Sequence, residues 1–441
     1  MRLSGWGNWP VADVRLASLR YADEAPGRLA EASSLIPRGN GRSYGDAALN
    51  PDLTLSMLAL SRIRAFDRDA GRMTVEAGAL LGDLLPVLTA AGWFPPVTPG
   101  TRFVTIGGMA AADVHGKNHH GAGSFAHHVE SIELLTPDGH VRLCTPRENA
   151  GLFEATLGGM GLTGLILTVT FHLMPIRSAW MRQETLPCAD LDSVMAAFEA
   201  SHEWTYSVAW IDCLASGGAL GRSLLYRAEH AEPDELPPPR RTDPFALPPR
   251  RPLAVPFYLP GRMLNGTTVR AFNALYYRRH AARAGTGIVD LDSYFYPLDA
   301  IADWNRIYGR RGFAQHQCVL PLQGAREGVR ELLERIGRAG SGSFLAVLKR
   351  LGPGRGGLSF PMAGYTLALD FPVTERNLAL MDELDAVVRA HGGRIYLAKD
   401  ARAGRPVIDS GYAGVDAFRD LRATPGEGAH LESLLSRRLG L

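Results

Sequence analysis

Three glycine-rich segments constrain the fold of this chain more than any other feature. They are IPRGNGRSYGD at residues 36–46, PGTRFVTIGG at residues 99–108 and LGGMGLTG at residues 157–164. Glycine permits positive φ angles and close backbone approach, so successive N–H groups can converge on an anion such as a diphosphate. Three such segments in one region favour an extended ligand that lies across several turns, although glycines that only form tight turns would explain them too.

The first segment does not match the dinucleotide-binding fingerprint. That fingerprint needs a strand, GxGxxG, a helix and an acidic residue about 20 positions further on. GNGRSYG places its glycines at other offsets, and no amphipathic helix follows it. A Rossmann fold is therefore disfavoured.

The periodicity predicts an α+β protein. Residues 72–81 read as a strand entering a helix, residues 131–145 as a hairpin around Pro137-Asp138-Gly139, and residues 161–175 as a turn followed by a strand. After about residue 178 helical repeats appear at 191–198, 329–336 and 380–388, with strand-like pieces QCVLPL and YTLALDF among them. A length of 441 residues predicts two domains, or one domain interrupted by another.

A long proline-rich stretch runs from residue 232 to residue 262. Its proline density argues against a helix and against a central strand, so the stretch is either a solvated loop or a mobile lid. Its arginines alternate with apolar residues and could hold a polyprenyl phosphate at a membrane surface. These arginines are Arg240, Arg241, Arg250, Arg251 and Arg262.

The composition excludes several classes. Forty-seven Lys+Arg against 45 Asp+Glu leave a net charge of +2, too small for a nucleic-acid-binding protein. The four cysteines contain no CxxC pair, which disfavours a disulfide framework or an iron–sulfur cluster. We expect a cytoplasmic protein, because the sequence has neither a secretory h-region nor an apolar run of about 18 residues.

The stretch HGKNHH at residues 115–120 is ambiguous by spacing alone. It fits a metal site, an acid–base cluster or the wall of a cofactor pocket. His115 and His119 are spaced i, i+4, but no HExxH occurs and no acidic third ligand lies in the segment, so no metal is expected.

Four motifs, in this order and spacing, resemble the FAD-binding half of the vanillyl-alcohol-oxidase-type flavoproteins. They are RGNGRSYGD, PGTRFVTIGGMAAADVHGKNHHGAGSF, LLTPDG and GLFEATLGGMGLTGLI. Within that family HGKNHH, FAQHQCVLP and YLAKD are similar to the flavoprotein subunits of decaprenylphosphoryl-β-D-ribose 2′-epimerases, oxidases of arabinan-precursor and cell wall biosynthesis. HGKNHH would then line the cofactor.

The resemblance implies a two-lobed FAD-binding domain of the PCMH/VAO type at residues 1–177. It also implies an inserted α+β substrate domain at 178–393 and a C-terminal segment, 394–441, that returns to the first domain. FAD would be bound non-covalently, because Arg42 stands where many relatives have the histidine that bonds to the flavin. The implied cofactor contacts are Arg38, Gly39, Asn40, Gly41, Arg42, Ser43, Tyr44, Gly45, Asp46, Gly100, Thr105, Ile106, Gly107, Gly108, Ala112, Asp113, Val114, His115, Ile166 and Tyr396.

The chemistry requires a hydride acceptor, a proton acceptor and a positive charge near the flavin. The resemblance assigns Lys399, Lys117 and His115 to catalysis. Gln315 and Gln317 alternate along a strand, so both can bind sugar hydroxyls from one face. The implied substrate contacts are Gln315, Gln317, Lys349, Thr366, Ala368 and Asp370, and an ion pair with Lys399 would also explain Asp370.

Three positions depart from the family pattern. Ala368 replaces a cysteine, Thr366 an asparagine and Phe295 a tyrosine. The substrate could therefore differ from ribose on a C50 lipid.

The resemblance implies oxidation of a secondary hydroxyl of a polyprenylphosphoryl pentose to a keto-sugar, with a separate NAD(P)H-dependent short-chain reductase as partner. It would act at the inner face of the membrane as a peripheral protein. The alternatives are a polyol or aldonolactone oxidase that uses oxygen and a non-catalytic flavin-binding scaffold. Lys399 and Lys117, which each lie within a motif, argue against the scaffold, and the basic proline-rich stretch argues against a small neutral substrate.

Overall fold

A small parallel sheet places the first glycine segment. The computed structural model describes residues 1–248, 253–260, 264–423 and 430–441. In it the strands β3 (Leu16–Ser18), β5 (Leu53–Ser56) and β4 (Leu35–Arg38) lie side by side in that order. Because β4 ends at Arg38, the chain enters the glycine segment directly from a sheet with a buried core. The hairpin β1 (Arg2–Ser4) and β2 (Val11–Asp13) and the helix α1 (Ala25–Ala30) flank this sheet.

A five-stranded antiparallel sheet forms the next layer. Its order is β10 (Val141–Cys144), β9 (Val129–Leu135), β11 (Leu165–His172), β7 (Arg72–Glu76) and β6 (Ile63–Asp67). The predicted hairpin at residues 131–145 and the strand predicted within 161–175 are confirmed. The helices α2 (Leu81–Ala90) and α3 (Ile106–Ala111) bury Leu84, Leu88 and Met109 in the core of this lobe. Short elements follow around it: β8 (Trp93–Phe94), α4 (His119–Ala122), α5 (Ala150–Thr156) and β12 (Met174–Pro175).

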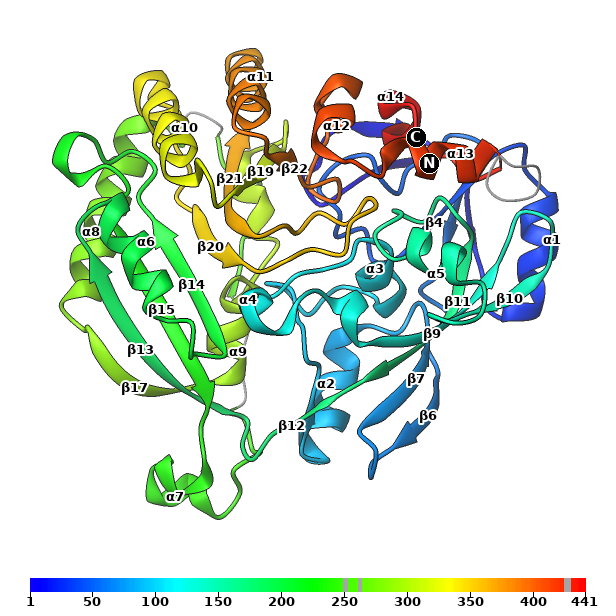
Figure 1. Cartoon of the computed structure of the whole chain (residues 1–441), viewed down its shortest axis with the longest axis horizontal. Coiled ribbons are helices and arrows are strands. Elements are labelled where there is room, and N and C mark those ends of the chain that lie inside the picture. The colour runs from blue at the N-terminus through cyan, green and yellow to red at the C-terminus, as the bar shows by residue number, and fades with distance from the viewer. Residues whose placement is uncertain (249–252, 261–263, 424–429) are drawn as a thin grey trace.

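An eight-stranded antiparallel sheet dominates the second lobe (Figure 1). Its order is β17 (Gly285–Asp290), β13 (Trp180–Cys188), β15 (Ser223–His230), β14 (Tyr206–Ile211), β20 (Val347–Leu351), β21 (Gly364–Pro372), β19 (Phe313–Pro321) and β22 (Arg394–Ile395). The helices α6 (Leu191–Glu199), α10 (Ala325–Ala339) and α11 (Glu375–Ala390) confirm the three predicted helical repeats.

The two faces of this sheet differ. Leu367, Leu369 and Leu320 point to a core shared with α6, α10 and α11. Because side chains alternate along a strand, Thr366, Ala368 and Asp370 on β21 point to the opposite face. That face meets the first lobe, so polar residues lie where the two lobes join.

The end of the chain lies against its beginning. The helices α12 (Arg405–Gly411), α13 (Val415–Ala423) and α14 (Leu434–Leu439) share a core with Ile36 and Leu162. Leu431 forms an isolated parallel bridge with Leu35, and both termini lie on the same side of the molecule (Figure 1). The exact boundaries at residues 177 and 393 stay predictions.

The proline-rich stretch contains more regular structure than we predicted. The one-turn helix α7 (Pro238–Arg241) begins with prolines, which the first turn of a helix tolerates because its N–H groups are not bonded within the helix. The two-residue strand β16 (Leu253–Ala254) pairs with β18 (Ile301–Ala302). The prediction that prolines preclude any helix is therefore wrong, whereas Arg250, Arg251 and Arg262 lie outside the described residues. The long helix α8 (Gly266–Ala281) and the short α9 (Leu291–Phe295) follow.

No described helix is both long enough and apolar enough to cross a bilayer. The mixture of separate helices and mainly antiparallel sheets confirms the α+β class.

Candidate functional site

A cleft in the first lobe brings all three glycine segments together. Its lining is mostly small side chains and backbone: Pro37, Gly39, Ser43, Ala47, Ala48, Met57, Ala77, Thr105, Gly107, Gly108, Ala111, Ala112, Met160, Gly161, Gly164 and Ile166. None of these described lining residues is acidic. A cleft of exposed backbone without carboxylates suits an extended ligand with a diphosphate, so its residues fit FAD.

Two glycines show why larger residues would close this cleft. A Cβ on Gly39 would lie 2.3 Å from Oγ1 of Thr105, which is far closer than real carbon atoms approach. Gly161 has a φ of +78°, a conformation that L side chains rarely adopt. The glycines of this cleft are thus required by backbone approach and do more than form turns.

The other predicted residues of the first segment hold its conformation. The guanidinium of Arg38 donates to the carbonyl of Ser4 at 2.7 Å, and Nδ2 of Asn40 donates to the carbonyl of Phe103 at 2.8 Å. The guanidinium of Arg42 lies over the Trp6 ring, 4.0 Å from its centroid, and 5.0 Å from that of Phe103.

Asp46 binds to the C-terminal segment. Its two carboxylate oxygens accept hydrogen bonds from Nη2 and Nε of Arg438 at 2.8 and 3.1 Å. Asp46 is absent from the cleft lining, and so are most of the other predicted contacts, among them the exposed Gly100 and the core residue Ile106. The predicted contacts that do line the cleft are Gly39, Ser43, Thr105, Gly107, Gly108, Ala112 and Ile166. Gly45 packs against the backbone of Asp400, where a Cβ would lie 2.1 Å from the carbonyl oxygen.

A strained turn presents His115. Asp113 has a φ of +38°, and its buried carboxylate accepts hydrogen bonds from Oγ of Ser124 at 2.9 Å, from the Ala126 amide at 3.0 Å and from Oγ of Ser359. The hydroxyl of Tyr396 donates to the carbonyl of Ala112 at 3.0 Å. These contacts fix the backbone on both sides of Val114.

The proton of His115 can be placed from its partner. Nε2 of Gln317 lies 3.0 Å from Nε2 of His115, and an amide nitrogen can only donate, so the ring proton resides on Nδ1. This Nδ1 is buried and has no hydrogen-bond partner among the described residues. Burial lowers the pKa of His115 well below its usual value, and the charges of Lys349 and Lys399 lower it further. His115 is therefore a neutral imidazole with one free N–H donor.

Three lysines from distant parts of the chain surround this histidine. Lys117, Lys349 and Lys399 are all partly buried. Burial lowers the pKa of Lys117 to about 7 and that of Lys349 to about 8. Nζ of Lys117 donates to the carbonyl of Tyr294, and Nζ of Lys399 lies 3.6 Å from the ring centroid of Tyr44. Such a set of cations favours an anionic ligand.

Asp370 is the carboxylate of this site. It is buried and accepts a hydrogen bond of 2.6 Å from Nε2 of Gln315, with the hydroxyl of Tyr308 at 3.5 Å. Burial raises the pKa of Asp370 and lowers that of Lys399, and each opposes the other's shift by its charge. The alternative explanation of Asp370, a direct ion pair with Lys399, is not supported: these two described residues form none, and their charges interact over a longer distance.

The remaining predicted substrate contacts lie on the same face. Oγ1 of Thr366 accepts a weak hydrogen bond of 3.3 Å from Nε2 of Gln317, and Ala368 is the cross-strand partner of Gln317. Phe295 is fully buried, with its ring centroid 4.9 Å from that of Tyr206.

Sequence reasoning missed several residues of the site. Met160, Gly161 and Gly164 line the cleft, and the third glycine segment was the signal that could have identified them. Tyr308 beside Asp370 gave no such signal, because it lies in a short 3₁₀ helix, residues 304–308, without a motif.

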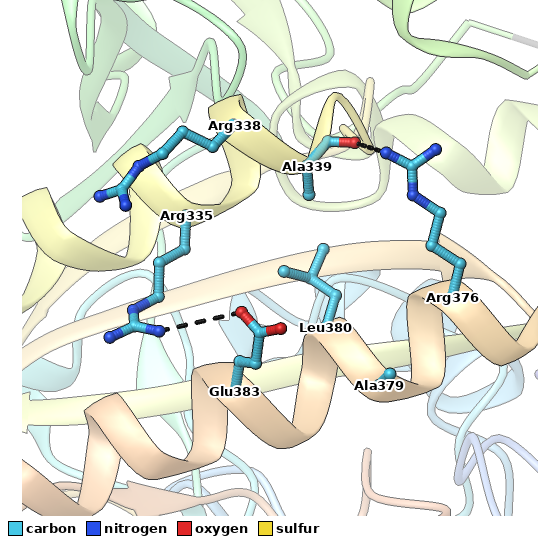
Figure 2. Close-up of a pocket in the computed structure, with 7 residues that line it drawn as sticks. All are labelled: Arg335, Arg338, Ala339, Arg376, Ala379, Leu380 and Glu383. Carbon is cyan, nitrogen blue, oxygen red and sulfur yellow. Dashed lines mark hydrogen bonds and ion pairs between the residues drawn. The ribbon is translucent and has the colours of Figure 1, made fainter.

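A second hollow lies on the outer side of the second lobe. Figure 2 shows it between α10 and α11, lined by Arg335, Arg338, Ala339, Arg376, Ala379, Leu380 and Glu383. Its arginines have partners: Arg335 forms ion pairs with Glu331 and Glu383, and Arg376 donates to the carbonyl of Ala339. It contains none of the residues predicted for the site.

Comparisons with known proteins agree with this geometry. Residues 28–145 match a family model described as an FAD binding domain. The chain is 37% identical to decaprenylphosphoryl-β-D-ribose oxidase of Mycolicibacterium smegmatis, over all of this chain and 97% of that protein. It is 38% identical to an uncharacterized protein of Streptomyces coelicolor, over 81% of this chain and 99% of that protein. L-gulonolactone oxidase of Mus musculus is 34% identical over 31% of each chain.

Proposed function

The chain belongs to the family of the decaprenylphosphoryl-β-D-ribose oxidases, and from this premise we propose that it oxidises a secondary hydroxyl of a polyprenylphosphoryl pentose, the 2′-hydroxyl of a ribose, to a keto-sugar. It is an FAD-dependent oxidoreductase. FAD, when bound, supplies the hydride acceptor. We propose that it is held non-covalently, because Arg42 occupies the place of the linking histidine and its guanidinium stacks on Trp6.

The observation that carries the proposal is the set of three partly buried lysines where the lobes meet. Lys117 and Lys349 would bind the phosphate, since their charge is otherwise costly at this degree of burial. Gln315 and Gln317 would bind hydroxyls of the pentose. A small neutral aldonolactone would leave these cations without an anion, and this argues against the lactone-oxidase alternative.

Lys399 and Asp370 would take the hydroxyl proton as a pair. Because burial raises the pKa of the Asp370 carboxyl and lowers that of the Lys399 ammonium, both groups can change protonation near neutral pH. His115 cannot be the proton acceptor, because its Nε2 already accepts from Gln317 and its Nδ1 carries a proton. His115 would instead donate its free N–H to the cofactor or to the reacting oxygen.

A keto-sugar product calls for a second enzyme that returns it to an alcohol. We propose an NAD(P)H-dependent short-chain reductase as that partner, and a peripheral location at the inner face of the membrane, where a polyprenyl carrier resides. The keto product is the chemical reason for the first proposal, and the lipid carrier is the reason for the second.

The decisive experiment is anaerobic mixing of the purified holoprotein with candidate substrates while the flavin absorbance is recorded. A polyprenylphosphoryl ribose should bleach the flavin, whereas the free pentose and an aldonolactone should not. Bleaching by the lactone alone would refute the proposed substrate class.

A further inference from the structure

One segment of the chain is strongly and uniformly basic. Residues 244–289 contain seven arginines, at positions 250, 251, 262, 270, 278, 279 and 283, and no aspartate or glutamate. The whole chain, in contrast, carries a formal net charge of only +2. A local excess of positive charge of this size requires either an anionic partner or full exposure to solvent. The described part of the segment includes α8.

The inner side of α8 packs on the face of the large sheet from which Gln317, Thr366 and Asp370 project, which we call the catalytic face. The Tyr276 ring lies against Trp210 of β14, with centroids 4.8 Å apart. Trp210 pairs in register with Val347, Val347 with Ala368, and Ala368 with Gln317. Side chains of laterally paired residues project from the same face of a sheet. Tyr276 therefore packs on the face that carries the predicted substrate contacts.

The outer side of α8 exposes apolar side chains next to arginines. Leu275 is 68% exposed and Phe272 is 45% exposed, and both lie on one side of the helix with Arg279, at spacings of i, i+3 and i+7. Leu253 and Phe257, in the chain just before the helix, are 72% and 63% exposed. Large apolar residues that are exposed together generally mark an interaction surface.

Aromatic rings connect this surface with the site. Phe272 contacts Phe344 at a centroid distance of 5.7 Å, and Phe344 stacks on Tyr308 at 5.9 Å. The hydroxyl of Tyr308 approaches Asp370. An apolar wall thus leads from the outer helix to the carboxylate of the site, as an isoprenoid chain attached to a phosphate would require.

We propose that α8, together with the described residues 253–260, forms a docking surface for an anionic lipid bilayer, from which the lipid-linked substrate reaches the sheet. This proposal rests on the proposed function, because only a lipid-linked substrate needs such an entrance. Exposed leucine and phenylalanine beside arginine are the residues that interfacial helices use to enter the headgroup region. An acidic protein would complement the charge of the arginines, but it would not explain why the apolar side chains of Leu275 and Leu253 are exposed.

This placement differs from that expected from the proline-rich stretch. The guanidinium of Arg240 lies 3.7 Å from the Trp180 ring centroid, and Nε of Arg241 donates to the carbonyl of Leu236 at 2.7 Å. Both belong to α7, which Figure 1 shows in a separate excursion at the bottom of the molecule, whereas α8 lies at its left edge. We assign the membrane contact to α8.

The test is co-sedimentation of the full-length holoprotein with vesicles of phosphatidylcholine and phosphatidylglycerol. The Arg278→Ser/Arg279→Ser double variant should bind at least about tenfold more weakly, since each basic residue near an anionic surface contributes roughly a factor of five. The Leu275→Ser variant should also bind about tenfold more weakly, because it removes a large apolar side chain that would enter the headgroup region. The Arg335→Ser/Arg338→Ser double variant removes the same charge from α10 and should bind like wild type, and so should Arg240→Ser/Arg241→Ser. An unchanged flavin spectrum verifies that each variant is folded.

The outcomes separate this proposal from the proposed function. Flavin bleaching by a water-soluble, short-chain phosphoryl ribose without vesicles tests the chemistry alone, and the α8 variants should retain it. Three results would overturn the docking surface. The wild-type protein does not bind anionic vesicles, or it binds only an acidic protein. Alternatively, vesicle binding is lost in the α10 or α7 variants rather than in the α8 variants. Vesicle binding that depends on α8 in a protein that no phosphoryl ribose bleaches would leave the surface in place and refute the substrate.

Discussion

The cleft of the first lobe and the catalytic face of the second lobe present opposite kinds of chemical groups to a ligand. The cleft consists of backbone and small residues, such as Gly39 and Gly161, and contains no charged side chain in its described lining. The catalytic face consists of long polar side chains from separate strands, such as Lys349 on β20 and Gln317 on β19. We therefore propose that the first region binds its ligand through shape and amide groups, and the second through charge.

This difference predicts different sensitivities to substitution. Backbone recognition fails when a side chain is added, because close packing leaves no room for it. Charge recognition fails when a side chain is removed or its protonation changes, because buried charges depend on their partners. The predictions below test each half of this comparison, from the largest effect to the smallest.

Removing Lys399 should cause the largest loss. Lys399→Ala should slow flavin reduction by substrate by about two to four orders of magnitude, the range expected for a lost proton acceptor. Rapid-mixing absorbance under anaerobic conditions measures this rate. Lys399→Arg is the informative control: arginine keeps the positive charge but does not become neutral near pH 7. If the arginine variant reacts as fast as wild type, Lys399 acts only through its charge and its role as a proton acceptor is excluded.

Adding a side chain to the cleft should weaken the binding of FAD. Gly39→Val should weaken FAD binding on the order of ten- to a hundredfold, because the new side chain would overlap Thr105 and overpacking of this kind costs about 1–3 kcal/mol. Flavin content after dialysis and FAD titration of the stripped protein measure the change. Gly151→Ala is the matched control, since a Cβ there has no atom within 4 Å. Equal flavin retention by the two variants would contradict backbone recognition.

The same contrast explains what could be predicted from the sequence. The glycine segments predicted the cleft, because the need for glycine at a position depends on the local backbone. The alternation of Gln315 and Gln317 predicted that both side chains lie on one face of a strand. The sequence did not contain the strand register that brings Lys349 opposite Thr366, nor the fold that places Gln317 beside His115, because these depend on pairings between distant strands. The helix α7 was missed because we treated its prolines as helix breakers at positions where they are tolerated.

Removing the hydrogen bond between Gln317 and His115 should have an intermediate effect on the rate of flavin reduction. Gln317→Leu removes the donor that keeps the ring proton on Nδ1, and we expect flavin reduction to slow on the order of tenfold, as for a lost buried hydrogen bond. Gln317→Glu should be worse, because a carboxylate accepts from Nε2 and would move the proton away from Nδ1. Both variants should keep their flavin. A glutamate variant that is faster than the leucine variant would mean that the Nδ1 proton has no role.

The smallest expected effect comes from pH and concerns binding. Lys117 and Lys349, with pKa values lowered by burial to about 7 and about 8, are largely charged at pH 6.5 and largely neutral at pH 8.5. A non-reactive phosphodiester analogue, whose own charge is constant over this range, should therefore bind on the order of tenfold more weakly at the higher pH. The sign follows because binding an anion raises the pKa of each lysine, so the complex takes up protons as the free protein loses them. Calorimetry in buffers of different ionisation enthalpy measures that uptake. Binding that does not change with pH and takes up no proton would remove these lysines from phosphate recognition, while the glycine-lined cleft would keep its role.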